Sequence, residues 1–315
     1  MLNRILRMFE QTDAITVLKE KLEPTDLQSL LLEIFRVRAG NVTIPKLLWQ
    51  YQNNRFVTPS TVDYRKILEL DTLAFSLLPA GYQALELAPV SPLGTCSALA
   101  PTDQNKVLST IRNTEVNADS TNSLALEYAA QRRQQKNSVE NLKLAASQRV
   151  VRAQKFTNVK GVLAHFRLLS LCSGGQRKVG ISAELEAVTE QLHYYLKLLA
   201  AVEQMAIFAP SPRIDILVYD EQWLEAIAKY FTYSTVAGTR ISVQLFEGKQ
   251  SYYQLLRYNI YATNTLGEEY FLCDGGFTDW TRRLLGNNKE WFLISGVGTE
   301  RLITCFEENY HGEID

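Results

Sequence analysis

Apolar residues recur at helical spacing in the first part of the chain. Between Thr25 and Gly40 they fall three or four positions apart, which is the spacing of one helix face. They are Leu27, Leu30, Leu31, Ile34 and Phe35. Gly40-Asn41 is expected to end this helix, and the pattern predicts a second helix over residues 44–51. We therefore expect residues 1–56 to form a helical N-terminal segment and residues 57–315 to form the main domain.

The pattern changes after a third predicted helix over residues 61–78. Short apolar runs separated by Pro, Gly, Asp and Asn are typical of strands. They predict strands over residues 84–89, 95–100, 107–116, 149–157, 162–172, 214–218, 251–262, 269–273 and 291–295. Helices are predicted from the Asp119 cap, over 134–147 by composition, and over 184–205, 221–231 and 278–285. Strands joined by turns, with helices between the groups, predict an α+β fold with a mostly antiparallel sheet.

Composition limits the classes of partner. The chain has 315 residues, 46% of them apolar, which is enough for a large core. The 33 basic and 34 acidic residues give a net charge of −1, so no overall charge favours nucleic acid, and tRNA is an unlikely partner.

The four cysteines and the first ten residues indicate the cellular compartment of the protein. Cys96, Cys172, Cys273 and Cys305 have no metal-site spacing and lie among apolar or small residues. This predicts four buried free thiols in a cytoplasmic protein. The first ten residues lack the apolar length of a signal peptide or a membrane span, so no membrane association is expected.

The most distinctive motif lies near the end of the chain. The apolar run 291–295 leads directly into Gly296-Val297-Gly298-Thr299-Glu300-Arg301. Glycines allow the backbone to approach a ligand closely. An arginine at the edge of a sheet can bind a phosphate or a carboxylate, so Arg301 is the first candidate site residue.

A second candidate region is a dense polar cluster between two apolar segments. Its members are Arg112, Asn113, Glu115, Asn117, Asp119, Thr121 and Asn122. Such a cluster at a sheet end can form a polar ligand pocket, with carboxylates for an amine and amides for hydroxyls. It can equally be a capped turn with an ion pair, and the sequence leaves both interpretations open.

The order of motifs in the last third of the chain resembles the class II aminoacyl-tRNA synthetases. Tyr252-Tyr253, then Asp274-Gly275-Gly276, then the Gly296 to Arg301 motif follow one another as in the histidyl-tRNA synthetase core. The regulatory subunit of ATP phosphoribosyltransferase shares that core. The resemblance runs from about Thr61 to the C-terminus.

The resemblance implies roles for particular residues. Arg301, with Glu300, Gly298 and Gly296, would bind ATP, which acts together with Mg²⁺. The substrate would be bound by the polar cluster before and at the start of the helix from the Asp119 cap, by Tyr252-Tyr253 and by the Asp274-Gly275-Gly276 segment. The residues concerned are Arg112, Asp119, Thr121, Asn122, Tyr252, Tyr253, Asp274 and Gly275. No metal site formed by protein side chains is expected. Family members dimerise through the first conserved motif, so the resemblance also implies a homodimer.

The second conserved arginine has two candidate registers. Arg152-Ala153-Gln154 is similar to the family's Arg-x-Glu, with glutamine in place of the carboxylate. An alternative register places Asn158 or Lys160 at the arginine position. The family arginine that precedes Tyr-Tyr has no counterpart, and no anticodon-binding domain is expected after residue 315.

Two functions are consistent with these features. The first is ATP-dependent activation of an amino acid or other carboxylate as an adenylate, for an acceptor other than tRNA such as a carrier protein. Arg301, Arg152 and Glu115 would then be the catalytic residues. The second is a catalytically silent paralogue that senses a ligand and regulates a partner enzyme. The altered second motif favours the silent paralogue, and the preserved Gly-x-Gly-x-Glu-Arg favours the ligase.

Overall fold

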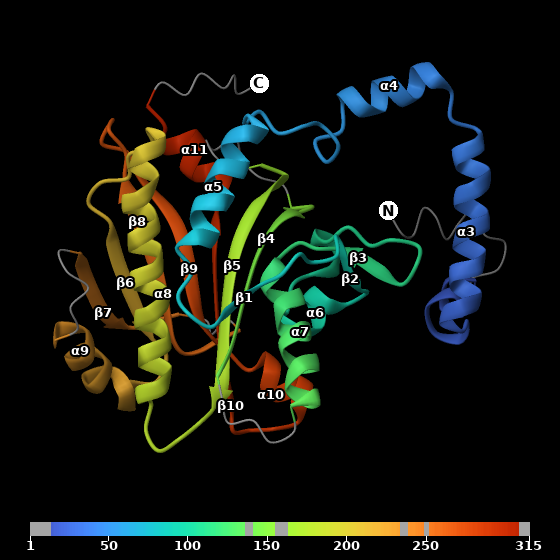
Figure 1. Cartoon of the computed structure of the whole chain (residues 1–315). Coiled ribbons are helices and arrows are strands. Elements are labelled where there is room, and N and C mark those ends of the chain that lie inside the picture. The colour runs from blue at the N-terminus through green and yellow to red at the C-terminus, as the bar shows by residue number, and fades with distance from the viewer. Residues whose placement is uncertain (1–13, 136–140, 155–162, 234–238, 249–251, 309–315) are drawn as a thin grey trace.

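An eight-stranded sheet forms the centre of the protein. The computed structural model describes residues 14–135, 141–154, 163–233, 239–248 and 252–308. The strand order is β1-β4-β5-β10-β9-β8-β6-β7 (Figure 1). The strands are Tyr82–Ala84 (β1), Leu142–Val151 (β4), His165–Gln176 (β5), Arg213–Val218 (β6), Arg240–Leu245 (β7), Tyr253–Thr263 (β8), Glu269–Thr278 (β9) and Glu290–Gly298 (β10). Among the described strands of this sheet, only the pairs β1–β4 and β6–β7 are parallel, which confirms the mostly antiparallel α+β prediction.

Helices cover both faces of this sheet. One face packs against α5 (Tyr64–Ser76) and α8 (Ser182–Ala201), and the other against α7 (Ser120–Gln134) and α10 (Trp280–Leu285). The remaining elements are α6 (Thr95–Leu99), α9 (Leu224–Tyr233), α11 (Thr299–Phe306) and a small sheet of β2 (Val90–Pro92) and β3 (Thr114–Val116). Strands β4, β5 and β10 therefore contribute side chains to two separate apolar cores, one on each face of the sheet.

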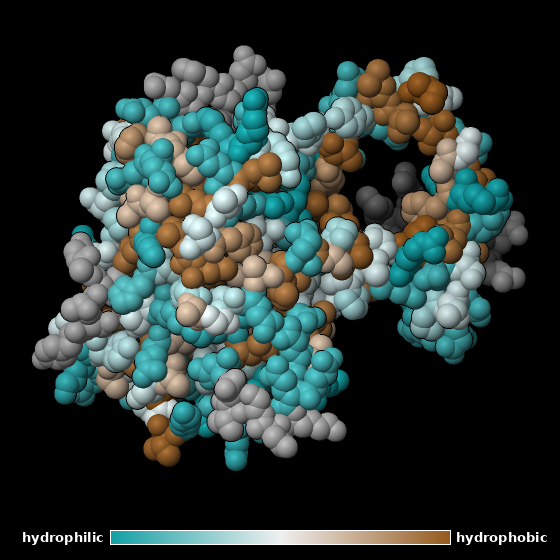
Figure 2. Space-filling model, viewed as in Figure 1, coloured by the Kyte–Doolittle hydropathy of each residue, from teal (hydrophilic) through white to brown (hydrophobic). Residues whose placement is uncertain are grey.

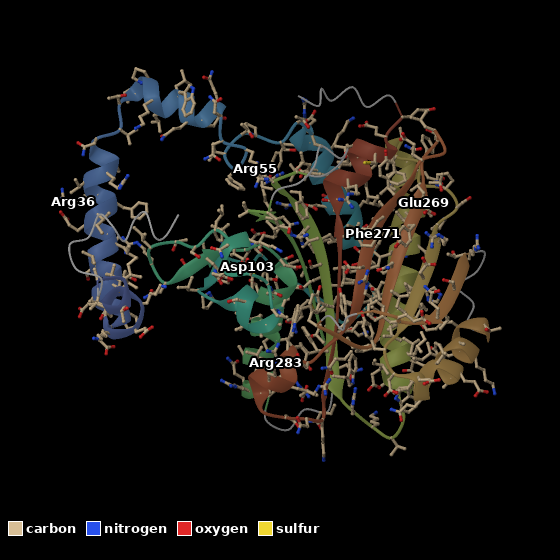
Figure 3. All side chains as sticks on the ribbon, turned by 180° about the vertical axis from the view of Figure 1, so that it is seen from behind. Arg36, Arg55, Asp103, Glu269, Phe271 and Arg283 are labelled. Carbon is tan, nitrogen blue, oxygen red and sulfur yellow. The ribbon has the colours of Figure 1, made fainter. Side chains whose placement is uncertain are left out.

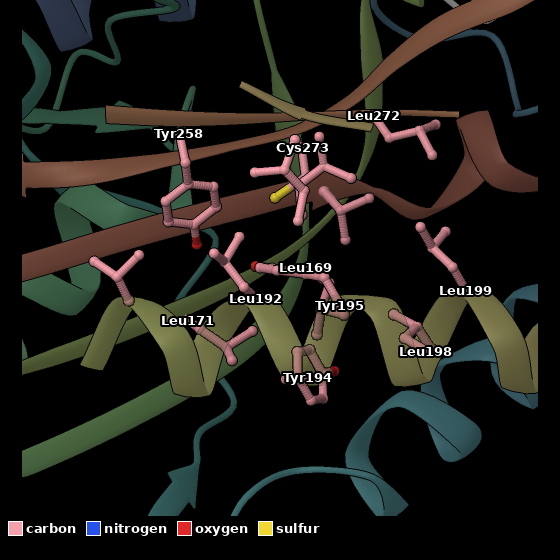
Figure 4. Packing of buried hydrophobic residues seen from close by; sticks show 14 of the residues in the cluster. Leu169, Leu171, Leu192, Tyr194, Tyr195, Leu198, Leu199, Tyr258, Leu272 and Cys273 are labelled. Atoms are coloured by element: carbon pink, nitrogen blue, oxygen red, sulfur yellow. The ribbon is translucent and has the colours of Figure 1, made fainter. Parts of the chain in front are cut away.

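Helix α8 shows why the larger core forms. Its apolar residues recur every three or four positions, so one face lies against the sheet (Figure 4). Two tyrosine hydroxyls in this core are paired: Tyr195 with Ser295 Oγ at 2.8 Å, and Tyr258 donating to Gln191 Oε1 at 2.8 Å. Burying these rings thus leaves neither hydroxyl unsatisfied.

The described part of the N-terminal segment, from residue 14 onward, is mostly helical, as predicted. It contains α2 (Ala14–Thr16), a π-helical turn (Val17–Lys21), α3 (Pro24–Gly40) and α4 (Ile44–Gln52). Helices α3 and α4 extend away from the body (Figure 1), and neither contains a buried residue. We call α3 and α4 together the arm.

Several predicted elements were wrong. Residues 95–99 of the predicted strand 95–100 form helix α6 instead. Gly94 adopts φ +89°, and the buried Glu115 carboxylate accepts hydrogen bonds from the backbone amides at the helix start. Only residues 114–116 of the predicted strand 107–116 pair as a strand. Of the predicted helix 134–147, residues 136–140 lie outside the described residues and residues 142–147 belong to strand β4. Strand β7 was not predicted.

The glycine motifs also differ from expectation. Asp274-Gly275-Gly276 is not a turn but the middle of β9. A Cβ on Gly275 would lie 2.5 Å from Tyr258 Oη, and one on Gly276 would lie 2.6 Å from Tyr253 Cδ1. Tyrosine rings therefore occupy the space that side chains would need. Gly296 and Gly298 likewise end strand β10, and helix α11 already begins at Thr299.

Candidate functional site

A cavity of about 200 Å³ lies on the sheet at the end of β10. Residues of β5, β9, β10 and α11 line it, together with Arg152 just after β4. Its lining residues include Arg152, Phe166, Asp274, Gly296, Gly298 and Arg301. We call this space the first cavity. The structure thus brings together side chains from four segments that are far apart in the sequence.

The two glycines of the motif create this space. Strand pairing places Gly296 between Asp274 on β9 and Ser170 on β5. A Cβ on Gly298 would lie 3.7 Å from Phe166 Cδ2 and 4.0 Å from Arg301 Cβ. The absence of a side chain at Gly298 therefore leaves open space beside the Phe166 ring and the Arg301 side chain.

Arg301 is held at the wall of the first cavity by its place in the first turn of α11. Its Nη1 donates to the carbonyl of Phe271 at 2.8 Å. Burial lowers the pKa of this guanidinium, although an arginine remains charged. A partly desolvated cation beside an empty space favours an anionic ligand.

Glu300 also lines the first cavity, but its carboxylate is engaged in contacts with neighbouring strands. Its carboxylate pairs with Arg149 and accepts a hydrogen bond from the Arg167 backbone amide at 3.1 Å. The residue is buried, so these contacts anchor the start of α11 to β4 and β5. Glu300 therefore positions its neighbour Arg301.

Arg152 follows directly after β4 and lines the same cavity as Arg301. Its Nε donates to the Ala118 carbonyl at 3.0 Å, and its Nη2 lies 3.6 Å from Asp119 Oδ2. Its Cζ lies 5.0 Å from the centre of the Phe166 ring, a cation–π distance. The alternative register with Asn158 or Lys160 lies outside the described residues.

A second cavity, also of about 200 Å³, adjoins the first at Arg152. Asp119, Asn122, Tyr252, Lys106 and Gln154 are among its lining residues. Asn122 is buried, and its Oδ1 has no hydrogen-bond partner. A buried acceptor without a donor, beside a carboxylate, suits an amine or a hydroxyl of a small ligand.

The tyrosine pair connects the two cavities. Tyr252 lines the second cavity and packs against Tyr253 with ring centres 4.5 Å apart. The Tyr253 hydroxyl donates to Asp274 Oδ2 at 2.9 Å, and Asp274 lines the first cavity. Burial raises the pKa of Asp274, against the opposing effects of the Tyr253 hydrogen bond and the Arg257 charge.

Other predicted site residues lie outside both cavities. Glu115 accepts hydrogen bonds from the Gly94 and Cys96 amides and from Gln104, each at 2.8 Å. Burial acts to raise the pKa of Glu115, but these hydrogen bonds outweigh it and the pKa is lowered. Its carboxylate therefore stabilises the loop around α6 and faces neither cavity.

Three further predicted site residues also lie outside both cavities: Arg112, Thr121 and Gly275. Arg112 is exposed in the turn before β3, and Thr121 donates to Asp119 Oδ1 in the cap of α7. Gly275 lies under the Tyr258 ring in β9. None of the three lines either cavity.

Two residues near the candidate site carry no sequence motif: Phe166, which lines the first cavity, and Arg55, which contacts the segment after β4. Phe166 alternates with Leu168 on β5, and that alternation beside Arg152 was the available signal. Arg55 lies on the segment that joins the arm to the body (Figure 3). Its Nη2 donates to the carbonyls of Ala153 and Gln154, both at 2.9 Å. No local pattern predicts that contact, since about a hundred residues separate the partners.

Comparison with solved structures decides the family of folds. No family model and no curated protein sequence matches the chain. The histidyl-tRNA synthetase of S. aureus superposes with a TM-score of 0.58 at 15% identity, over 82% of this chain and 72% of its own. A Bacillus halodurans protein described as an ATP phosphoribosyltransferase regulatory subunit/histidyl-tRNA synthetase gives 0.57 at 14%, over 81% and 83%. The chain has a class II synthetase-like core.

A third similar structure superposes on this protein over nearly the whole of its length. The histidine–tRNA ligase subunit from Alicyclobacillus acidocaldarius superposes with a TM-score of 0.57 at 12% identity, over 78% of this chain and 96% of its own. On this class II synthetase-like fold, the Gly296 to Arg301 motif lies at the end of the strand next to the β4–β5 hairpin. The predicted resemblance in fold is confirmed.

Replacing Asp274 by asparagine is expected to stabilise the class II core by about 0.5–2 kcal/mol at neutral pH. Asparagine keeps an acceptor for the Tyr253 hydroxyl and removes a buried charge. Because folding raises the pKa of Asp274, its ionisation disfavours the fold at pH values above the folded pKa. The gain should therefore shrink as the pH falls toward the unfolded pKa.

Urea unfolding of both proteins at pH 7.5 and pH 4.5 measures this difference. A stability gain that is equal at the two pH values, or a loss of stability at pH 7.5, would contradict the raised pKa of Asp274 in the folded protein.

Proposed function

We propose that this protein activates a small carboxylate with ATP, forming an acyl-adenylate for an acceptor other than tRNA. ATP would bind in the first cavity and the carboxylate, an amino acid or a related acid, in the second. The observation that supports this most directly is that Arg152 lines both cavities. A cation at the junction is where a carboxylate and an α-phosphate would meet.

The chemistry requires charge stabilisation more than proton transfer. A carboxylate oxygen bonds to the α-phosphorus, and the bond to the bridging oxygen breaks as pyrophosphate leaves. Arg152 and Arg301 would offset the negative charge that concentrates there. Asp119 and the Asn122 Oδ1 would accept hydrogen bonds from an amine of the substrate.

The residues fit a nucleotide better than they fit an isolated metal ion. Phe166, Arg301 and the two glycines offer an aromatic face, a cation and close backbone approach. In the described parts of the chain, no group of three His, Cys, Asp or Glu side chains could hold a metal. Magnesium would therefore arrive with the ATP phosphates and lower their charge.

A second function, ligand sensing without catalysis, is favoured by one residue. Gln154 stands where the family motif has a carboxylate. In that case the same two cavities would bind a nucleotide or amino acid, and the protein would regulate a partner enzyme.

All four cysteines are free and buried, which confirms the thiol prediction and suits our proposal of a cytoplasmic protein. None of the helices in the described ranges is long and apolar enough to cross a membrane.

Pyrophosphate exchange into ATP across a panel of amino acids and small acids separates the two functions. Exchange that depends on one acid supports adenylation. Binding of nucleotide or acid by calorimetry without exchange supports ligand sensing. Absence of ATP binding would contradict the adenylation proposal.

Gly298→Leu is expected to weaken ATP binding at least about tenfold, a loss of about 1.4 kcal/mol. A leucine side chain would enter the open space beside Phe166 and Arg301. The fold should tolerate it, since Gly298 has φ −74° and its Cβ would make only ordinary contacts. Gly298→Ala is the matched control, with an expected change below about threefold. Equal ATP affinity in the leucine variant and the wild type, by calorimetry, would place the nucleotide elsewhere.

A further inference from the structure

The second cavity is small and mostly polar. Apart from the Cys96 thiol, its apolar lining consists of Ala100, Ala118 and the Tyr252 ring. Its volume of about 200 Å³ is below the ~300–1,000 Å³ of pockets for drug-sized ligands. Exposed apolar side chains lie on the arm instead, where Ile44 is 78% exposed, and Figure 2 shows this apolar surface away from the body. The second cavity therefore suits a small polar acid better than a fatty or aromatic one.

The charges that line the second cavity do not balance. Asp119 Oδ2 lies 3.6 Å from Arg152 Nη2, so these two groups largely offset each other. Burial raises the pKa of the Cys96 thiol to about 12, so the sulfur carries no charge at neutral pH. Lys106 is the remaining charged group, and no described side chain forms an ion pair or a hydrogen bond with its ammonium group. An excess positive charge in a cavity favours a ligand with an additional negative charge.

The backbone around Lys106 is held beside Arg152. The Lys106 carbonyl accepts a hydrogen bond from the amide of Ala153, the residue after Arg152, at 3.0 Å. Two positions earlier, Gln104 Nε2 donates to the buried Glu115 carboxylate at 2.8 Å, which ties the same helical turn to the fold. Two cations from different segments thus line one small cavity, and each can bind its own carboxylate.

We propose that the second cavity binds an acidic amino acid, whose side-chain carboxylate pairs with Lys106. The inference rests on the proposed function, in which the α-carboxylate meets Arg152 at the junction of the two cavities. The ammonium group would donate hydrogen bonds to Asp119 and to Asn122 Oδ1, which is buried and has no partner. Asn122 Nδ2 already donates to Cys96 Sγ at 3.3 Å, so Oδ1 is the free end of this amide. Each of the three charged groups of the ligand thus has a matching group in the cavity.

Calorimetry of the full chain with L-aspartate, L-glutamate, L-asparagine and L-glutamine, with and without ATP, tests this assignment. Each amide matches its acid in size and lacks only the side-chain charge. We expect one acid to bind at least about tenfold more tightly than its amide, the effect of one hydrogen bond between charged groups. Because Lys106 is exposed, the difference should shrink as salt is added. Pyrophosphate exchange should show the same order of substrates.

Variants of Lys106 connect the preference to this side chain. Lys106→Met should remove the preference for the acid while leaving the affinity for the amide unchanged, and Lys106→Glu should make the amide the tighter ligand. Lys229→Met, on the exposed surface of α9, is the matched control and should keep the wild-type preference. Unchanged amide binding in Lys106→Met would also establish that this variant is folded.

The outcomes separate this inference from the proposed function. An acidic amino acid that binds without pyrophosphate exchange would support the assignment and contradict adenylation. Exchange driven by a neutral amino acid, with both acids inactive, would support adenylation and overturn the assignment. Equal affinities for acid and amide, a preference that survives Lys106→Met, or no binding of either acid would also overturn it.

Discussion

Glu290→Ala should destabilise the fold by about 3–5 kcal/mol, the usual cost of removing one partner from a buried ion pair. Glu290 Oε1 accepts from Arg132 Nη2 at 3.1 Å, and both side chains are less than 5% exposed. The Tyr128 hydroxyl donates to the other carboxylate oxygen at 3.0 Å. Alanine would remove both acceptors and leave the Arg132 charge in a dry environment.

A double variant distinguishes loss of pairing from loss of packing. Arg132→Met with Glu290→Leu removes both charges while keeping apolar volume, and should recover most of the stability. Urea unfolding of the single and double variants gives the comparison. A single variant that loses less than about 1 kcal/mol would mean that Arg132 finds adequate solvation without Glu290.

Arg301→Ala should lower pyrophosphate exchange by about 10²- to 10³-fold, the range seen when one group that stabilises transition-state charge is removed. The variant should remain folded, because the hydrogen bond to the Phe271 carbonyl is a modest contribution to stability. Arg240→Ala, an exposed arginine on the edge strand β7, is the control and should leave exchange unchanged. Calorimetry with ATP should show weaker binding in Arg301→Ala as well.

The outcome for Arg301 can be separated from the choice of function. If the wild type binds ATP but shows no exchange, loss of ATP binding in Arg301→Ala still places the nucleotide in the first cavity. Wild-type levels of both exchange and ATP binding in the variant would remove Arg301 from the site.

Much of the fold was predictable because its signals are local. The face of α8, the Asp119 cap of α7 and the β8–β9 hairpin each depend on residues within one element. Predictions failed where distant groups decided the conformation. Residues 95–99 became helical because Glu115, some twenty positions away, binds the amides of Gly94 and Cys96. Propensity alone does not include that contact.

The candidate site shows the same division. The Gly296 to Arg301 motif and the Arg152 segment were identified from sequence order, whereas Glu115 was assigned to the site because it lies close to Asp119 in sequence. The fold buries its carboxylate in the α6 loop. Phe166 and Arg55 had no motif of their own, and only chain folding brings them beside Arg152 and Gln154.

The order of apolar and polar residues was thus sufficient for the α+β class, the helical N-terminal segment and the glycine–arginine motif. These features follow from periodicity and from residue types at short spacing, which are properties of the chain itself. The tertiary structure alone decided which polar groups line a cavity and which are hydrogen-bonded or ion-paired within the fold. It also revealed that the arm's apolar face lies unburied, because burial depends on what packs against a helix and not on the helix alone.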